Sequence, residues 1–195
     1  MKRARWWGAA ALTMLVLPLA LGACRGRESG ADGGSLDGFV QTAAALTDAG
    51  IIAILDEASL SDSVAAALAA EKATDPGVKA FATSAMEDHH ALRVDGARLV
   101  KALGLTPRLP ASDPLGTVAE DEMIALRATP RGPEFDRVYI EKEVATRQAV
   151  KDFSEQAKRA TPNDQIRSFI DRVTSVIERH LERAQALRNG IAKTA

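Results

Sequence analysis

The chain of 195 residues contains three histidines, and two of them have the spacing of ligands in a helical metal site. His89 and His180 each fall in a series of apolar residues spaced alternately by three and four, as on a helix face packed against other helices. Imidazoles on facing helices are one way in which bundles bind metals. We therefore expect the two side chains to meet across a core, either as ligands of a single transition-metal ion or as hydrogen-bonded core residues.

Acidic residues beside His89 are the next candidates. Asp88 lies about 60° from the centre of the same helix face, so it is either a flanking metal ligand, a hydrogen-bond partner or a solvated surface residue. Glu87 and His90 have the Glu-x-x-His spacing of di-iron bundles. They lie about 160° and 140° from that centre, however, and we expect both to face outward.

The other reactive residue types do not form a catalytic set in the sequence. There is no serine-nucleophile motif, phosphate-binding loop or haem-attachment motif. Inward-facing carboxylates from all four main helices, as a complete di-iron site requires, cannot be assembled. Glu143 and Arg147 have the i, i+4 spacing of a helix-surface ion pair, and Tyr139 is expected to be a core ring with its hydroxyl at the edge. We assign no catalytic residue.

Start and stop signals define the helices that carry these residues. Asp75-Pro76 opens and Gly104 closes a helix from about Pro76 to Leu103. No alternating strand pattern is present, which predicts an all-α protein with four main helices in an antiparallel bundle and short extra helices. The other predicted segments are a helix start at Leu36 to Ala45, a short helix from Thr47-Asp48, a second segment from Ser59 or Ser61 to about Thr74, and helices over Leu115 to Ala128, Glu134 to Ala160 and Pro162 to Asn189.

The beginning of the chain has the composition of an export leader. Basic residues precede an apolar run from Ala9 to Leu21, which is typical of a secretory signal and short for a membrane span. The run ends in Leu21-Gly22-Ala23-Cys24, which resembles the lipobox of bacterial lipoproteins. We expect lipid attachment at Cys24, with an ordinary signal or an uncleaved anchor as the alternatives.

Cleavage before Cys24 would divide the chain into a signal peptide (1–23), a Gly- and Ser-rich flexible tether (24–35) and a helical-bundle domain (36–195). The leader holds three basic and no acidic residues, so its removal lowers the formal charge from −1 to −4, which gives no field for nucleic acid. Cys24 is the only cysteine, which excludes a disulfide or a cysteine metal site in the lipidated chain.

We expect export and membrane attachment through the lipid. Because Arg25 rather than Asp follows Cys24, the periplasmic side of the outer membrane is favoured over the inner membrane, with the cell surface as an alternative. No protein partner or oligomeric state is indicated.

Three blocks of sequence resemble a known family. Their order and spacing are similar to those of the domain-of-unknown-function 4142 family, secreted or lipid-anchored bacterial proteins with a ferritin-like helical bundle. The resemblance covers about Leu46 to Leu187 and implies that fold. The blocks are Leu46-Thr47-Asp48-Ala49 continuing through Asp75-Pro76 to Asp88-His89, Phe135-Asp136-Arg137-Val138-Tyr139, and Arg179-His180-Leu181-Glu182-Arg183-Ala184.

The resemblance also implies functional positions. The family tends to have an acidic residue early in the first main helix, Asp-His in the second, and a histidine in the third and fourth. Here these positions fall on Asp62, Asp88 with His89, Arg147 and His180. Arg147 departs from the pattern, because a guanidinium is permanently cationic and does not ligate a metal as imidazole does. We therefore expect a non-enzymatic envelope protein with a binding, scaffolding or stress-related role. The alternative is a ferritin-like protein that binds or oxidises iron, manganese or copper through His89, His180 and Asp88.

Overall fold

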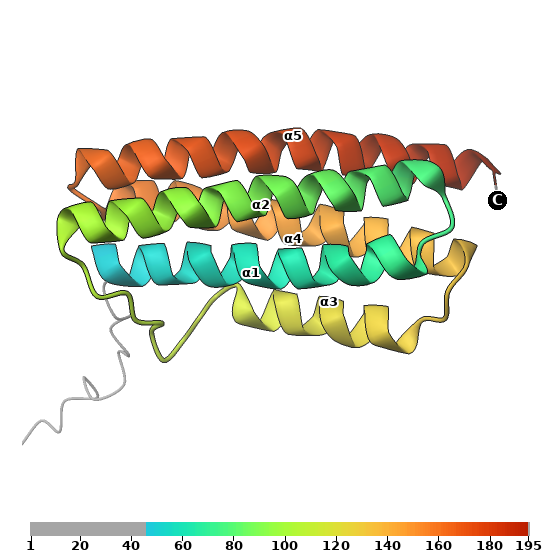
Figure 1. Ribbon diagram of the computed structural model, residues 1–195, viewed down its shortest axis with the longest axis horizontal. Coiled ribbons are helices and arrows are strands. Elements are labelled where there is room, and N and C mark those ends of the chain that lie inside the picture. Colours follow the sequence, from blue (N-terminus) through green and yellow to red (C-terminus); the bar gives the residue numbers. More distant parts are fainter. Residues whose placement is uncertain (1–45, 195) are drawn as a thin grey trace, which may run out of the picture. The chain divides into compact units, whose positions relative to one another are not determined.

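The structure is a computed structural model that describes residues 46–194. Within this range the chain forms five helices and no strand (Figure 1). Four of them form an antiparallel bundle, and the short α3 lies outside it, packed against α1 and α4. The prediction of an all-α fold is confirmed, and the arrangement is consistent with a ferritin-like bundle. The helices are α1 (Asp48–Lys72), α2 (Pro76–Leu103), α3 (Gly116–Ala128), α4 (Pro133–Ala160) and α5 (Asp164–Thr194).

The ends of α2 lie where the sequence places them. The Asp75 side chain accepts hydrogen bonds from the backbone N–H groups of Gly77 and Val78, and Pro76 occupies the first turn. Gly104 ends the helix at φ 62°, in the left-handed region that favours glycine. These local signals fix the length of α2, so that His89 lies near its middle.

The beginning of the bundle differs from expectation, because α1 is one continuous helix. The sequence predicts a break at Ser59 or Ser61. Instead, Ser59 is buried within the helix, and its carbonyl accepts a hydrogen bond from the Ser63 hydroxyl one turn later. A serine hydroxyl can bond either as a cap or back to the helix itself, and the local sequence does not distinguish the two. Because α1 is continuous, Asp62 lies in its interior rather than near a helix start.

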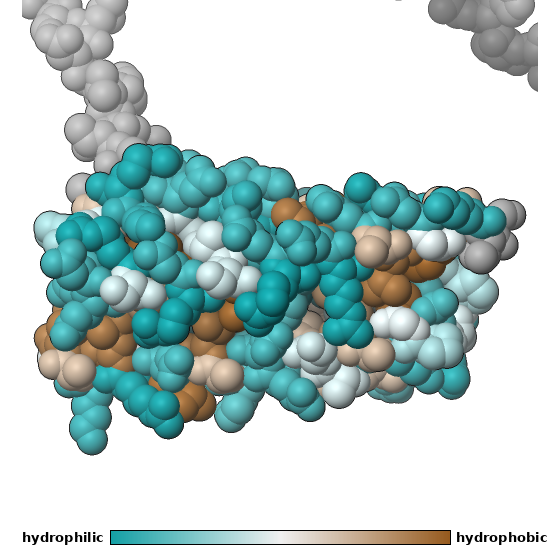
Figure 2. All heavy atoms as spheres, turned by 90° about the horizontal axis from the view of Figure 1, so that it is seen from above, coloured by the Kyte–Doolittle hydropathy of each residue, from teal (hydrophilic) through white to brown (hydrophobic). Residues whose placement is uncertain are grey.

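The other three helices are near their predicted ranges. Asn163 caps α5, because its side chain accepts hydrogen bonds from the N–H groups of Gln165 and Ile166. The helix continues past Gly190 to Thr194. Hydrophilic side chains cover much of the face seen in Figure 2, as expected of helices that bury only one side.

Two apolar clusters fill the core, one toward each end of the bundle. In one, isoleucines from α1 and α5 pack with Leu92, Val150 and Phe153. In the other, alanines of α1 and α2 pack with Phe81 and Phe135. In α1, α2, α4 and α5 alike, a short stretch that carries buried polar residues lies between the residues of the two clusters.

Several predictions concern segments outside the described residues. These are the signal peptide (1–23), the lipidated Cys24, the tether (24–35) and the helix start over residues 36–45. Among residues 46–194, no helix is long and apolar enough to cross a bilayer.

Candidate functional site

Every helix of the described range contributes a buried polar side chain to the band between the two apolar clusters. We call the residues of this band the polar centre. Its members are Asp62 on α1, His89 on α2, Glu122 on α3, Glu143, Thr146 and Arg147 on α4, and His180 on α5. Burial of so many ionisable groups is costly unless they pair with one another, so their mutual geometry decides what the polar centre can do.

Arg147 joins two acidic residues within the polar centre. Its Nη1 lies 2.5 Å from Asp62 Oδ2, and its Nη2 lies 2.6 Å from Glu143 Oε2. All three side chains are inaccessible or nearly so, with exposed fractions of 0% for Arg147 and Glu143 and 2% for Asp62. The prediction of a surface ion pair between Glu143 and Arg147 is therefore wrong, because the i, i+4 spacing specifies contact but not which side of the helix is covered.

The charges around Arg147 set the protonation of its partners. Burial opposes ionisation of Asp62, but the Arg147 guanidinium and His89 outweigh it and hold the pKa of Asp62 below its usual value. Burial opposes the charge of Arg147 as well, and Asp62 and Glu143 more than compensate by raising its pKa. Burial raises the pKa of Glu143 to about 7, against the pull of Arg147. The polar centre thus holds one charged pair, Asp62 with Arg147, and one carboxyl, that of Glu143, whose pKa is near neutral pH.

His89 lies beside this ion pair. Its Nε2 is 3.2 Å from Asp62 Oδ2, the same oxygen that Arg147 contacts. Burial lowers the pKa of His89 to about 4, despite the nearby negative charge of Asp62. The imidazole is consequently neutral at physiological pH.

His180 meets His89 across the core, as the spacing of the two histidines predicts. The ring centroids lie 5.5 Å apart in an edge-to-face arrangement. His180 Nε2 lies 2.8 Å from Asp88 Oδ2, and Asp88 is 36% exposed at the edge of the bundle. Burial, with the charge of Arg147, lowers the pKa of His180. Asp88 is thus a hydrogen-bond partner, one of the three roles that the sequence left open.

Glu122 was not singled out from the sequence, although it is 2% exposed. The Thr146 hydroxyl donates a hydrogen bond of 2.8 Å to Glu122 Oε2. Burial, followed by repulsion from Glu143 and Asp62, raises the pKa of Glu122 well above its usual value. Glu122 lies one turn from Leu126, the buried apolar residue of α3, and this i, i+4 relation is the signal that would have placed it inward.

Buried carboxylates face inward from α1, α3 and α4, which is fewer helices than the four that a complete di-iron site requires. Tyr139 is a core ring as predicted, but its hydroxyl is buried rather than at the core edge, and burial with the charge of Glu143 raises the pKa of Tyr139 well above its usual value. Glu87 and His90 are exposed on α2, as their rotation predicts. Within residues 46–194, no three acidic, histidine or cysteine side chains are placed to hold one ion.

The sequence was also compared with known families. Residues 38–187 match the family described as "Domain of unknown function (DUF4142)". The chain belongs to the DUF4142 family. The expected resemblance is confirmed over most of the domain. Asp62, His89, Arg147 and His180, at which the resemblance predicts functional positions, form a chain of neighbouring side chains.

A solved structure shows the same fold. The DUF4142 domain is similar to the crystal structure of a DUF305 fragment from Deinococcus radiodurans, with a TM-score of 0.64 and 12% sequence identity. The similarity covers 73% of this chain and 95% of the DUF305 fragment. No curated protein matches the chain. The comparisons thus establish the family and the helical fold.

Proposed function

We propose that this DUF4142 protein is a non-enzymatic helical bundle of the bacterial cell envelope, held on the membrane by a lipid at Cys24. In this proposal the polar centre aligns the helices and performs no chemistry of its own. The observation that carries the proposal is the position of Arg147, whose guanidinium lies between Asp62 and Glu143 and pairs with both. The residue that departs from the family pattern thereby supplies the positive charge that these carboxylates require.

The geometry around Arg147 disfavours a metal at this point. A cation bound by Asp62 or Glu143 would lie within a few ångströms of the guanidinium, and the like charges would repel strongly in the low-dielectric core. Each of the two carboxylates already has an ion-pair contact with the guanidinium. The polar groups would then fix how far each helix is shifted along its neighbours, since only one axial alignment of the helices brings these groups together.

The location rests on sequence features. The apolar leader, the Leu21-Gly22-Ala23-Cys24 tetrapeptide and the Gly- and Ser-rich tether would place the bundle outside the cytoplasm on a flexible arm. Arg25 after Cys24 favours the periplasmic side of the outer membrane, with the cell surface as the alternative. On such an arm the domain would bind or scaffold partners in the envelope.

The anchor is tested by metabolic labelling with a clickable fatty acid in the native host. We expect label and membrane fractionation in the parent chain, and loss of both in the Cys24→Ser variant. Ser35→Ala, in the predicted tether, is the control and should label like the parent. An unlabelled parent chain, or label that persists in Cys24→Ser, would contradict the anchor.

The role of the polar centre is tested by metal analysis of protein purified without a metal-binding tag. We expect no stoichiometric metal in the parent or in the His89→Ala/His180→Ala variant, with the double variant less stable. His90→Ala, the exposed neighbour on α2, is the matched control and should leave stability unchanged. Turnover of peroxide or of a metal ion that His89→Ala abolishes would overturn the non-enzymatic proposal.

A second candidate function is metal binding by His89 and His180 with Asp88, for iron, manganese or copper. The observation that favours it is the contact between the two imidazole rings, 5.5 Å apart between centroids. Asp88, at the outer end of this set, lines a groove of about 410 Å³ between α2 and α5 that reaches the surface. About one metal ion per chain in the parent, lost in the double variant, would select this function.

A further inference from the structure

The helix α3 lies outside the four-helix bundle and packs on α1 and α4. Within α3 only Glu122 and Leu126 are buried, and Leu115 is buried just before its start. Ile124 is 60% exposed on the outer side. Val118 and Met123 are partly buried, and Met123 packs against the second apolar cluster. A titratable side chain is therefore one of the two buried side chains of α3.

Few polar contacts fasten α3 to the bundle. Among the hydrogen bonds of the described residues, two cross from α3 to other helices. Thr146 on α4 donates to Glu122, and the Lys72 ammonium on α1 donates to the carbonyl of Leu126 at 2.7 Å. The Thr146 hydroxyl can donate to the neutral or to the ionised Glu122 carboxyl, and its hydrogen bond acts to lower the pKa of Glu122, so this bond alone does not decide whether α3 stays in place.

The helices that pack against α3 present mainly negative charge to Glu122. Asp62 faces it from α1, and Glu143 faces it from α4. Arg147, the cation that acts on Glu122 against these charges, is engaged by the same two carboxylates. The other carboxylates of α3 itself, on Glu120 and Asp121, are exposed. Loss of the proton would thus place a third carboxylate against two others without a cation of its own.

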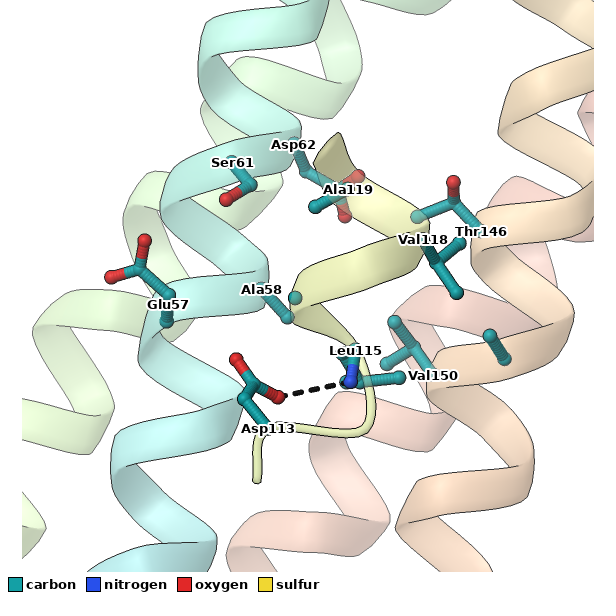
Figure 3. A pocket seen from close by; sticks show the side chains of 12 residues that line it. Glu57, Ala58, Ser61, Asp62, Asp113, Leu115, Val118, Ala119, Thr146 and Val150 are labelled. Carbon is teal, nitrogen blue, oxygen red and sulfur yellow. Dashed lines mark hydrogen bonds between the residues drawn. The ribbon is translucent and has the colours of Figure 1, made fainter. Parts of the chain in front are cut away.

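The inner side of α3 is loosely packed near its beginning. A cavity of about 20 Å³ lies between α1, the start of α3 and α4, and its lining includes Asp62, Leu115 and Thr146 (Figure 3). A cavity of about this volume has room for one water molecule. Solvent can therefore enter beside Asp62 and Thr146 with a small displacement of α3.

The segments on both sides of α3 allow such a displacement. Residues 104–115 connect it to α2, and residues 129–132 connect it to α4. Gly104 and Gly132, with φ angles of 62° and 147°, stand at the outer ends of these segments, next to α2 and α4. The first turn of α3 has no side-chain cap.

We propose that α3 is a cover over the polar centre that swings away from the bundle when Glu122 loses its proton. In the closed state Glu122 is neutral, accepts the Thr146 hydrogen bond and faces Asp62 and Glu143. In the open state its carboxylate is solvated, and Asp62, Glu143 and Arg147 become accessible from the side that α3 covered. Rising pH favours the open state, because the open state releases the proton at lower pH than the closed state does.

The experiment is hydrogen–deuterium exchange of the full chain between about pH 5 and pH 8, with each rate divided by the intrinsic rate at the same pH. In the parent, the opening constant of α3 amides should rise about tenfold per pH unit until Glu122 ionises in the closed state too. In Glu122→Gln, which keeps the hydrogen-bond acceptor but cannot ionise, that constant should rise less steeply with pH, because Glu143 is then the remaining carboxyl with a pKa raised by burial that opening exposes. Glu120→Gln makes the same chemical change at an exposed site of α3 and should behave like the parent.

Amides of α2 and α5 serve as the internal reference and should show no such rise in any of the three proteins. Flat exchange of α3 in the parent would overturn the proposal. So would a rise in Glu122→Gln equal to that of the parent, or an equal rise in all helices, which would indicate global unfolding rather than movement of α3. The inference does not depend on whether the polar centre has a purely structural role.

Discussion

Two buried carboxylate sites in this protein are stabilised in different ways. At the α1–α2 junction, Asp136 of α4 is 3% exposed and accepts hydrogen bonds from the Thr74 N–H at 2.8 Å, the Thr74 hydroxyl at 2.6 Å and the Asp75 N–H at 2.9 Å. In the polar centre, Asp62 and Glu143 are instead paired with the charge of Arg147. The first site is stabilised by neutral donors and the second by a balance of charges.

The difference shows how each site responds to change. The donors to Asp136 are two backbone N–H groups and a hydroxyl, none of which carries a charge, so this site depends on hydrogen bonds and not on a cation. The polar centre contains Asp62, His89, Glu122, Glu143 and His180, each with a pKa shifted by burial and by its neighbours. The stability of this second site must therefore depend on protons and on the integrity of its one strong cation.

The largest effect is expected from Arg147→Met. This change leaves Asp62 and Glu143 buried without their cation, and loss of one partner of a buried pair costs about 3–5 kcal/mol. Chemical denaturation at neutral pH measures the free energy of unfolding. The matched control is Arg137→Met on the same helix, whose ion pairs are exposed and should contribute little.

Removing the two carboxylates together with the cation tests whether charge balance stabilises the polar centre. Replacement of all three members, in Asp62→Asn/Glu143→Gln/Arg147→Met, removes the stranded charges and should recover much of the stability that Arg147→Met loses. If the triple variant is less stable than Arg147→Met, charge balance is not what stabilises the polar centre.

Asp136→Ala should have the next largest effect. It leaves two backbone N–H groups and one hydroxyl of the α1–α2 turn without their acceptor, a loss of about 2–4 kcal/mol. Asp136→Asn retains one acceptor oxygen and should lose less. A stability for Asp136→Ala equal to that of the parent would show that solvent replaces Asp136 at the turn.

The pH dependence of the polar centre separates the two sites further. Glu143 has its pKa raised to about 7, so its contribution to stability is complete below its unfolded pKa and is lost as pH rises through about 7. The pKa of His89 is lowered to about 4, so its contribution to stability has the opposite pH dependence. As the pH falls below the usual histidine pKa, His89 of the unfolded chain binds a proton before His89 of the folded chain does, and stability falls. The two slopes oppose each other in the parent between about pH 4.5 and pH 6.5.

Glu143→Gln removes the part of the pH dependence of stability that Glu143 causes. Relative to the parent, its folding equilibrium constant should rise by up to about tenfold per pH unit between about pH 4.5 and pH 7. Denaturation curves at a series of pH values measure the difference, in which the other groups cancel. Glu141→Gln, half-exposed on the same helix, should show no comparable slope. An equal pH dependence of Glu143→Gln and the parent would mean that Glu143 does not titrate in this range.

The smallest effect is expected at the surface. Arg93 Nε lies 2.9 Å from Asp56 Oδ1, but both side chains are more than a third exposed. Arg93→Met should change the free energy of unfolding by less than about 1 kcal/mol, and the change should shrink further at high salt. A loss as large as that of Arg147→Met would mean that burial does not govern the energy of ion pairs in this bundle.

Much of the fold could be predicted from local sequence. The apolar positions of α2, α4 and α5 repeat with helical spacing, and Asp75 and Gly104 mark the ends of α2. Prediction failed where a residue has more than one local use. Ser59 is a residue type that often caps the start of a helix, yet it lies inside α1. Its carbonyl there accepts a hydrogen bond from the Ser63 hydroxyl, and the surrounding structure, not the residue type, decides which of these roles a serine has.

The candidate site was predictable in part. His89 and His180 lie on the apolar faces of their own helices, and the sequence alone placed both in the core. The resemblance named Asp62, and the spacing paired Glu143 with Arg147, but neither predicted burial, and Glu122 was missed. A carboxylate on a helix is usually solvated, and a buried one is recognised only by the cation beside it. The partner Arg147 lies 85 residues from Asp62 along the chain.

The sequence by itself determined an all-α chain, the faces that its long helices bury and the two histidines within those faces, because each of these follows from a repeat of about 3.6 residues. Only the tertiary structure decided which charges pair, which carboxyls remain protonated and that α3 carries a glutamic acid into the core. Those properties depend on how far each helix is shifted and rotated relative to its neighbours, and the packing of whole helices, not any local pattern, sets these two quantities.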